Sequence, residues 1–512
     1  MTSTVFVDQQ TVVPAAWLND VNTGIYTILG AGGAVPATIP IARANLGVNG
    51  KLAFINITDY PYLADNTGST DATSIITAAI AALAAAGGGV LFFPRGRYKY
   101  STFLVDSGYI TLMGEGPYAS VLECNSVNGG VVFSGSSLPL CGVVSLGFAQ
   151  TVNSTTATSA LLKTVGVFRF LVHDCFFNGF SGGSSYAHQL LSLSGTSVYL
   201  SNINGSGGKT NGLYIEAGND YIIQGATINL SAVTGRPLYI KDVTAGSLEL
   251  SNCNFLEGAN CLISNSNIGR FNSVFFDSAQ GGLAVSGCED LDFIGCEFAN
   301  RVTTGSGDGT GVVFGNSKNC KLIGGAVINC GTDGVQIAAD TVGIQLIGVN
   351  IDGNNTSDTA GKAGVQVAAG AQAFRIIGGR SGNNTALWTG HQKYGIAVAA
   401  GGSNNYLIDG VDVRNNDTLG LVDNGTGTAA RVINNTGYNP VAAVSGAAGA
   451  SPYTYTAGHA PETVYITGGT VSLVTVEGVA IYTSTDKTVH LGPNKSVVIT
   501  HAGAPTVTRV PE

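Results

Sequence analysis

One short phrase recurs along the middle of the chain, and it constrains the fold more than any other feature. Each copy starts with a small residue and continues with two or three apolar residues, followed by a polar turn and a second apolar strand. The first apolar residues of the copies are Leu213, Leu238, Leu262, Leu283, Val312, Val335, Val365, Ile396 and Leu421. The mean step is about 26 residues, which is typical of solenoids. Short β-branched strands with no amphipathic helix between them favour a β-solenoid, in which each coil packs on its neighbours.

The second apolar strand of each coil predicts which side chains face the core, because alternate residues of a strand point to opposite faces of the sheet. The residues predicted to face inward are Leu250, Phe293, Ile323, Leu346 and Ile376. The residues predicted to face outward on the same sheet are Glu249, Asp292, Leu322, Gln345 and Arg375. The sequence therefore predicts an all-β fold, a single-stranded parallel β-helix.

The composition excludes several classes of protein. Charged residues are 11% of the 512 residues and the net charge is −9, which argues against nucleic acid as a partner, since phosphate contacts need a basic surface. The first ten residues lack the basic start and apolar core of a signal peptide. The most apolar helical stretch, Ile75–Ala86, is too short to cross a bilayer, so no membrane insertion is expected. The nine cysteines form no C-x-x-C pair and are expected to be free buried thiols.

The first 52 residues form a separate segment. The stretch Val12–Asn22 reads V-V-P-A-A-W-L-N-D-V-N and is followed by a Gly-, Ala- and Pro-rich link. It resembles the N-terminal virion-attachment segment of bacteriophage tail fibres and tailspikes. The resemblance implies that residues 1–52 bind a phage tail protein. It also implies that the protein is located in the virion, in the phage tail, after synthesis in the host cytoplasm.

The β-helix is predicted to span residues 53–438 and to begin beside a short helix. Asp71 or Thr73 can cap a helix over Ala72–Ala86, and three glycines from Gly87 end it before an apolar strand. This order is similar to the entry of pectate-lyase-like right-handed β-helices, where a capping helix precedes a strand of the form GG-V-FP-G-Y. The resemblance implies a right-handed coil whose open end is covered by the helix. The turn departs from the family, which often has consecutive aspartates where Asp71 stands alone.

The remaining residues, 439–512, are predicted to hold a linker and a small β module. The segment Tyr438–Pro461 is rich in Ala, Gly and Pro and is interpreted as a linker or crossing segment. The strands predicted in Glu462–Glu512 are Thr463–Ile466, Val471–Val476, Thr488–Leu491 and Ser496–Thr500. This stretch resembles the C-terminal modules of phage tailspikes, which implies trimerisation. Because about fifty residues seldom fold alone, a homotrimer is expected.

Acidic residues gather in one part of the β-helix, where charged residues are otherwise scarce. The group comprises Glu249, Glu257, Asp277, Glu289, Asp290, Asp292 and Glu297. We predict that Glu249 and Asp292 share one outward column two coils apart, with Arg270 between them to hold one carboxylate ionised. Glu257 and Asp277 follow strands of successive coils and come near each other at a turn, either facing or merely adjacent.

These four residues, Glu249, Asp292, Glu257 and Asp277, are the candidate catalytic residues. Carboxylates on neighbouring and next-nearest coils lie about 5 Å and about 10 Å apart, which brackets the separations used in retaining and inverting glycoside hydrolysis. The alternative is a solvated ladder of charges on a sheet face, with no catalytic role.

Three further residues are candidates for substrate binding. They are Arg270, Asp308 in a glycine-rich loop, and Trp388, whose indole can stack on a sugar ring. Neither His188 nor His391 has partners at ligand spacing in the sequence, so no catalytic metal is predicted. No cofactor is predicted either.

Two functional hypotheses from different classes follow. The first is a homotrimeric phage tailspike that binds a bacterial surface polysaccharide (capsule, exopolysaccharide or O-antigen) and degrades it, by hydrolysis rather than by a lyase reaction. The second is a non-enzymatic receptor-binding tail fibre, since a fold alone does not supply a function. A cellular pectate-lyase-like enzyme is disfavoured by the missing signal peptide and by the Val12–Asn22 stretch.

Overall fold

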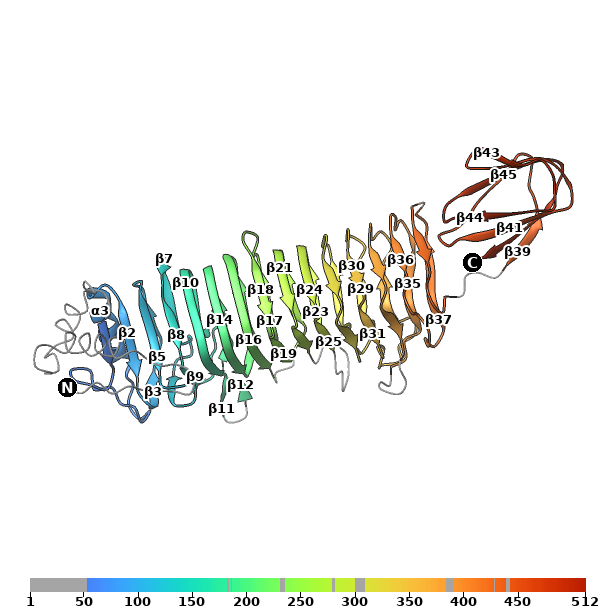
Figure 1. Ribbon diagram of the computed structural model, residues 1–512. Coiled ribbons are helices and arrows are strands. Elements are labelled where there is room, and N and C mark those ends of the chain that lie inside the picture. The colour runs from blue at the N-terminus through green and yellow to red at the C-terminus, as the bar shows by residue number, and fades with distance from the viewer. Residues whose placement is uncertain are drawn as a thin grey trace, which may run out of the picture.

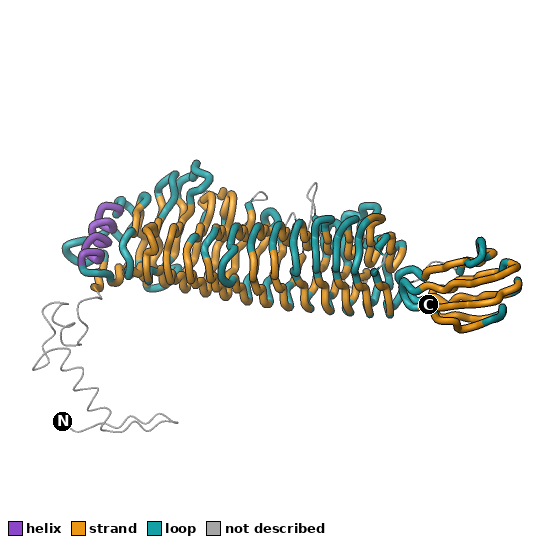
Figure 2. The backbone as a smooth tube through the Cα atoms, turned by 90° about the horizontal axis from the view of Figure 1, so that it is seen from above, coloured by secondary structure: helices purple, strands orange, loops and turns teal. Residues whose placement is uncertain are grey.

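The computed structural model is a long parallel β-solenoid with a helix at one end and two small antiparallel sheets at the other (Figures 1 and 2). It describes residues 53–181, 184–185, 187–230, 235–278, 281–299, 309–383, 390–427, 429–438 and 443–512. The proposed virion-attachment segment, residues 1–52, lies outside the described residues. The predicted fold class, an all-β right-handed parallel β-helix with a capping helix and a small C-terminal β unit, is confirmed.

Three parallel sheets run the length of the solenoid, and each coil contributes strands to them in turn. The first sheet contains β4 (Phe103–Val105), β7 (Val131–Pro139), the start of β10 (Ala160–Asn178), β13 (Ala187–Leu193), β15 (Gly208–Glu216), β17 (Arg236–Lys241), β20 (Cys261–Ser264), β23 (Leu283–Ser286), β26 (Val312–Gly315), β29 (Val335–Ile337), β32 (Ala363–Val367), β35 (Tyr394–Gly401) and β37 (Leu419–Gly425).

The second sheet contains β1 (Ala53–Asn56), β2 (Gly89–Phe93), β5 (Ile110–Gly114), β8 (Gly142–Val144), the middle of β10, β14 (Gly195–Ser206), β16 (Asn219–Leu230), β18 (Leu248–Ser251), β21 (Asn267–Asn272), β24 (Glu289–Ile294), β27 (Lys321–Ile323), β30 (Gln345–Ile347), β33 (Arg375–Ile377), β36 (Leu407–Asp409) and β38 (Arg431–Ile433). The third contains β3 (Gly96–Tyr100), β6 (Ser120–Cys124), β9 (Gly147–Gln150), the ends of β10, β14 and β16, β19 (Asn254–Glu257), β22 (Phe275–Asp277), β25 (Glu297–Ala299), β28 (Ala326–Ile328), β31 (Asn350–Asp352) and β34 (Arg380–Gly382).

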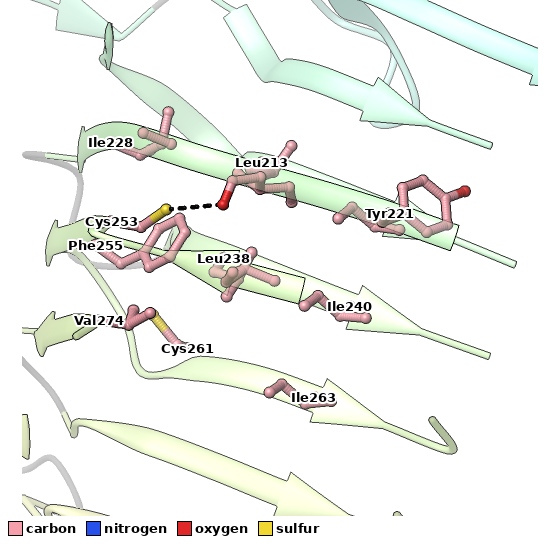
Figure 3. Close-up of a cluster of buried hydrophobic side chains, with 14 of the residues drawn as sticks. Leu213, Tyr221, Ile228, Leu238, Ile240, Cys253, Phe255, Cys261, Ile263 and Val274 are labelled. Atoms are coloured by element: carbon pink, nitrogen blue, oxygen red, sulfur yellow. Dashed lines mark hydrogen bonds between the residues drawn. The ribbon is translucent and has the colours of Figure 1, made fainter. Parts of the chain in front are cut away.

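The core is a stack of inward side chains that repeats from coil to coil. Figure 3 shows part of it, where Leu213, Leu238 and Ile263 point into the same interior as Cys253, whose Sγ lies 3.7 Å from the Ile223 carbonyl oxygen. All nine cysteines are free and buried, as predicted. Burial raises the pKa of these thiols, that of Cys288 to about 11, which keeps them protonated and inert.

Two predicted registers are wrong by one residue. Leu262 is the partner of Tyr239, and Cys261, not Leu262, is the partner of Leu283 in the first sheet; the Cys261 side chain is fully buried. In β27 the inward residue is Leu322, while Ile323, which we expected inside, is half-buried on the outer side. In each case two adjacent apolar residues leave the alternation ambiguous in the sequence, and the hydrogen-bonded neighbours decide it.

The helix α3 (Thr73–Ala85) covers the first coil. Its buried residues are Ile76, Ala79, Ile80 and Leu83. The N-cap position is Ala72, whose side chain has no acceptor, and the Asp71 carboxylate accepts a hydrogen bond from the Thr73 amide at 2.8 Å. Asp71, the residue before the N-cap, therefore satisfies one of the free amide groups at the start of the helix.

The C-terminal module is a pair of four-stranded antiparallel sheets with a core of its own. One sheet holds β39 (Val444–Ala447), β46 (Thr506–Pro511), β41 (Glu462–Thr467) and β44 (Lys487–Leu491), and the other holds β40 (Tyr453–Thr456), β45 (Ser496–Gly503), β42 (Thr470–Val476) and β43 (Val479–Tyr482). The four predicted strands are present. The linker interpretation is wrong for β39 and β40, which belong to the sheets, because alternating Tyr and Thr in β40 satisfies the strand pattern despite the flanking glycines and prolines.

Candidate functional site

A ladder of charged side chains runs along the outer face of the second sheet. Glu249 pairs with Arg270, Arg270 with Asp292, and Asp292 with Lys321 on the next strand. Glu249 and Asp292 therefore share one outward column two strands apart with Arg270 between them, as the sequence predicted. Because neighbouring strands are about 4.8 Å apart, the two acidic residues are separated by about 10 Å at the backbone.

The ladder borders a shallow pocket of about 380 Å³. Its lining includes Glu249, Arg270 and Asp292, together with Asp290 and Ile268. Strands β18, β21 and β24 bring these residues together from three successive coils, although they are up to 43 positions apart in the sequence. The pocket thus presents two carboxylates and a guanidinium to anything that lies across the strands.

The charges of this ladder alternate in sign. Lys321 Nζ lies 2.8 Å from Asp292 Oδ1, and their side chains are 33% and 25% exposed. Glu249 and Arg270 are exposed. Asp292 therefore has a cation directly on one oxygen, whereas the Glu249 side chain is open to solvent and to a ligand.

Asp277 and Glu257, the second predicted pair, do not face each other. Asp277 pairs with Leu256 on the preceding strand, so Glu257 stands one residue beyond it. Glu257 has a φ of 56° and an exposed side chain, because the chain turns there at the end of β19. The structure does not bring the four predicted acids into one site. Glu249 and Asp292 lie on the second sheet, whereas Glu257 and Asp277 lie on the third.

Glu297 is a neighbour of Asp277 that the predicted pairs did not include. It pairs with Phe275 in β22, two residues before Asp277, and both carboxylates flank inward phenylalanines. On the geometry of parallel strands their Cα atoms are about 8 Å apart. Burial, with a contribution from the Asp277 charge, raises the pKa of Glu297. The signal was present in the sequence, since aligning Phe276 with Phe298 places both acids on the outer face.

His391 has carboxylate neighbours that its sequence surroundings did not predict. Its ring lies with Asp358 and Asp417 in a group whose potential ligand atoms are all within 4.8 Å of one another. The Lys393 ammonium contacts both carboxylates, at 2.5 Å from Asp358 and 3.1 Å from Asp417. A cation thus already occupies the space between these acids, and the group is exposed. The two remaining candidates, Asp308 and Trp388, lie outside the described residues.

Comparison with known protein families gives a match to the first half of the solenoid. Residues 54–254 match the family described as rhamnogalacturonase A/epimerase, pectate lyase-like. The sequence-based resemblance to that β-helix is therefore confirmed for the first half of the solenoid. The comparison with curated protein sequences found no match.

Solved structures share the β-solenoid fold of this chain at low sequence identity. The Dettilon tailspike protein is 11% identical over 96% of this chain and 99% of its own, with a TM-score of 0.54. A tailspike mutant of E. coli bacteriophage HK620 in complex with a hexasaccharide is 11% identical over 96% of this chain and 100% of its own (TM-score 0.51). The mannuronan C-5 epimerase AlgE6 A-module of Azotobacter vinelandii is 17% identical over 75% of this chain and 100% of its own (TM-score 0.51). These likenesses establish the fold.

Among the helices in the described residues, none combines the length and apolar character needed to cross a membrane.

Proposed function

We propose that the protein is a phage tailspike that binds a bacterial surface polysaccharide along its β-helix and hydrolyses its glycosidic bonds. The observation that carries this proposal is the pocket on the second sheet, where Glu249 and Asp292 flank Arg270. An extended sugar chain lying along the sheet would pass all three side chains. The shared fold with two tailspikes, one of them solved with a hexasaccharide, supports the substrate class.

The chemistry needs one carboxyl group that gives a proton and one that stays ionised. Glu249, exposed to the ligand, would protonate the leaving glycosidic oxygen. Asp292, held in place by Lys321 at 2.8 Å, would act as the general base and activate a water. A backbone separation of about 10 Å leaves room for that water, as inversion of configuration requires. Arg270 would bind hydroxyl or acidic groups of the sugar between them.

Assembly and location belong to the same proposal. We expect a homotrimer in the phage tail, attached through residues 1–52, with no nucleic-acid partner. The tailspike likeness over 96% of the chain supports this assignment. The net charge of −9 is consistent with the absence of a nucleic-acid partner.

The test is release of reducing ends from purified capsule or O-antigen of a host strain. Glu249→Gln and Asp292→Asn should each lower the rate at least 100-fold. Asp277→Asn, Glu297→Gln and Glu257→Gln form the comparison set. A loss confined to Asp277→Asn and Glu297→Gln would move the site to the third sheet. A rate unaffected by all five changes would reject hydrolysis by these acids. Unsaturated products that absorb ultraviolet light would identify a lyase instead.

The alternative is a receptor-binding tail fibre without enzymatic activity. The alternating charges of Glu249, Arg270, Asp292 and Lys321 favour it, since a self-neutralising ladder can bind polar groups without chemistry. Polysaccharide binding without new reducing ends, together with plaques that lack haloes, would establish this function.

A further inference from the structure

A second pocket, larger than the one at the charged ladder, lies on the first sheet. Its volume is about 500 Å³. Strands β10, β13, β15 and β17 form its floor, and Thr158, from the loop before β10, is part of its wall. None of the candidate residues from the sequence lines it. It is therefore separate from the ladder of Glu249, Arg270 and Asp292, which lies on the second sheet.

The floor of this pocket is one outward column of four residues. Lys163 pairs with Ser192, Ser192 with Tyr214, and Tyr214 with Tyr239. The two tyrosine rings have centroids 5.2 Å apart at an interplanar angle of 49°. Both rings are half-buried, so each keeps part of its surface open to the pocket. Such a pair offers a broad apolar surface with polar edges, at little loss of side-chain entropy.

Charged groups stand at the edges of this aromatic surface. Glu216 lines the pocket beside Tyr214, and burial with the adjacent Glu216 carboxylate raises the pKa of Tyr214 to about 12. Glu216 Oε1 lies 3.1 Å from Lys241 Nζ, which fixes the carboxylate as an acceptor. Among the described residues, no carboxylate lies within ion-pair distance of Lys163 at the other end. One edge thus offers an anchored acceptor, and the other offers an ammonium without a counter-ion.

We propose that this pocket is a saccharide subsite, in which a sugar ring stacks on Tyr214 and Tyr239 and an anionic substituent of the sugar binds Lys163. The inference rests on the proposed function, which supplies the polysaccharide, and adds a place and a chemical class of sugar. Sugar rings have apolar faces that suit tyrosine rings, and Glu216 accepts hydrogen bonds from hydroxyl groups. Lys163 is two strands from Tyr214, about 10 Å at the backbone, and this spacing suits a carboxylate on the same or the next sugar.

The test uses an array of purified bacterial capsular and O-antigen oligosaccharides, neutral and acidic. Titration calorimetry follows with the oligosaccharide that the wild type binds best. We expect an acidic oligosaccharide to bind best. Tyr214→Ala and Tyr239→Ala should each raise its Kd about tenfold or more. Tyr214→Phe, which keeps the ring, should stay within threefold. Lys163→Gln should remove the preference for acidic over neutral oligosaccharides.

The controls separate the subsite from the proposed function. Tyr465→Ala changes an exposed tyrosine of the C-terminal module and should bind as the wild type does. Unchanged Kd values for both tyrosine→Ala variants, in a wild type that binds and cleaves, would overturn the subsite alone. Unchanged preference in Lys163→Gln would overturn the anionic part. A wild type that binds no bacterial glycan would count against the proposed function and the subsite together.

Discussion

At the scale of single residues, the clearest unfavourable electrostatic interaction is the repulsion between the Glu297 and Asp277 carboxylates on the third sheet. Glu297 is half-buried, and both its burial and the nearby Asp277 charge raise its pKa. A raised pKa means that the folded state binds the proton more tightly than the unfolded state does. The charged form of Glu297 therefore destabilises the fold, and this destabilisation grows as the pH rises through the ordinary pKa of 4.5 and then through the raised one.

Glu297→Gln should increase the free energy of unfolding at pH 7, because the glutamine carries no charge to bury or to repel Asp277. The gain should shrink as the pH falls below 4.5, where the wild-type carboxyl is protonated in both states. Urea denaturation at pH 7 and pH 4 measures both. Glu257→Gln, at an exposed position, should change stability by less than about 0.5 kcal/mol at either pH. A variant less stable than the wild type at pH 7 would contradict the charge argument.

The sequence predicts whether a strand residue faces the core or the solvent only when the residues on either side of it differ from it in polarity. Glu249 and Asp292 were placed correctly because each stands between apolar residues of its strand. Ile323 and Leu262 were placed wrongly because each follows another apolar residue. The alternation of the strand is then satisfied whichever of the two residues faces the core. Glu257 could not be oriented, since its place depends on a turn with φ of 56° that the alternation does not encode.

At the scale of elements, stacked phenylalanine rings on successive strands of the third sheet pack one coil against the next. Phe276 stacks on Phe255 at 5.9 Å and on Phe298 at 5.2 Å, with interplanar angles of 24° and 4°. It also meets Phe293 edge-on at 6.5 Å. Because Phe276 contacts rings from both adjacent coils, one side chain links three coils.

Phe276→Ala should lower the free energy of unfolding by about 3–5 kcal/mol, as expected for removal of a buried aromatic ring that leaves a cavity. Phe54→Ala, at a ring that is 47% exposed in the first coil, should have a much smaller effect. Thermal and chemical denaturation of both variants check this. A loss of less than about 1 kcal/mol in Phe276→Ala would show that the stack is not needed.

Strand β43 is the element most suited to contacts between copies of the chain. It lies at the edge of its sheet, and its residues Val479, Ala480, Ile481 and Tyr482 are all exposed. An exposed apolar edge strand is a template for pairing with another chain. If the proposed homotrimer forms here, Ile481→Lys should shift the mass from trimer to monomer in light scattering. Ser472→Lys on the neighbouring β42 should leave the trimer intact. A trimer in both variants would place the interface elsewhere.

The elements themselves were largely predictable, and the exceptions have local causes. The period of about 26 residues fixed the solenoid, and the helix over Thr73–Ala85 differs from its prediction by one residue at each end. The strands β39 and β40 were missed because their pairing partners lie far along the sequence: β46 is 59–65 residues after β39, and β45 is 40–46 residues after β40. The aligned repeats place Tyr214 beside Tyr239, since each follows the first apolar residue of its copy. The pocket was missed because other strands and loops also contribute to its lining.

At the scale of the whole molecule, the solenoid and the C-terminal module are joined by a polar cluster. Asp423, in the last strand of the first sheet, accepts a hydrogen bond from the Tyr406 hydroxyl at 2.6 Å and lies 2.5 Å from His459 Nδ1. His459 precedes β41 of the module, and its carbonyl accepts a hydrogen bond from the Val432 amide at 2.6 Å. The Asp423 and His459 side chains are 6% and 15% exposed, so the ion pair is shielded from water.

This cluster makes the junction sensitive to pH. The hydrogen bond and charge of Asp423 raise the pKa of His459 above its ordinary 6.5. The stabilisation from the pair is therefore fully present below pH 6.5 and is lost as the pH rises through the raised pKa.

We therefore expect the melting temperature of the C-terminal module to fall between pH 6 and pH 9, beyond any change in the solenoid. Scanning calorimetry of the full chain resolves the two transitions if they separate. His459→Gln should abolish this pH dependence, because glutamine does not titrate. Asp423→Asn should lower the stability of the junction by about 3 kcal/mol at pH 6, where it leaves a buried imidazolium without its partner. His490→Gln, at an exposed histidine of the same module, is the matched control. A pH dependence that survives in His459→Gln would show that another group controls how the module is held on the solenoid.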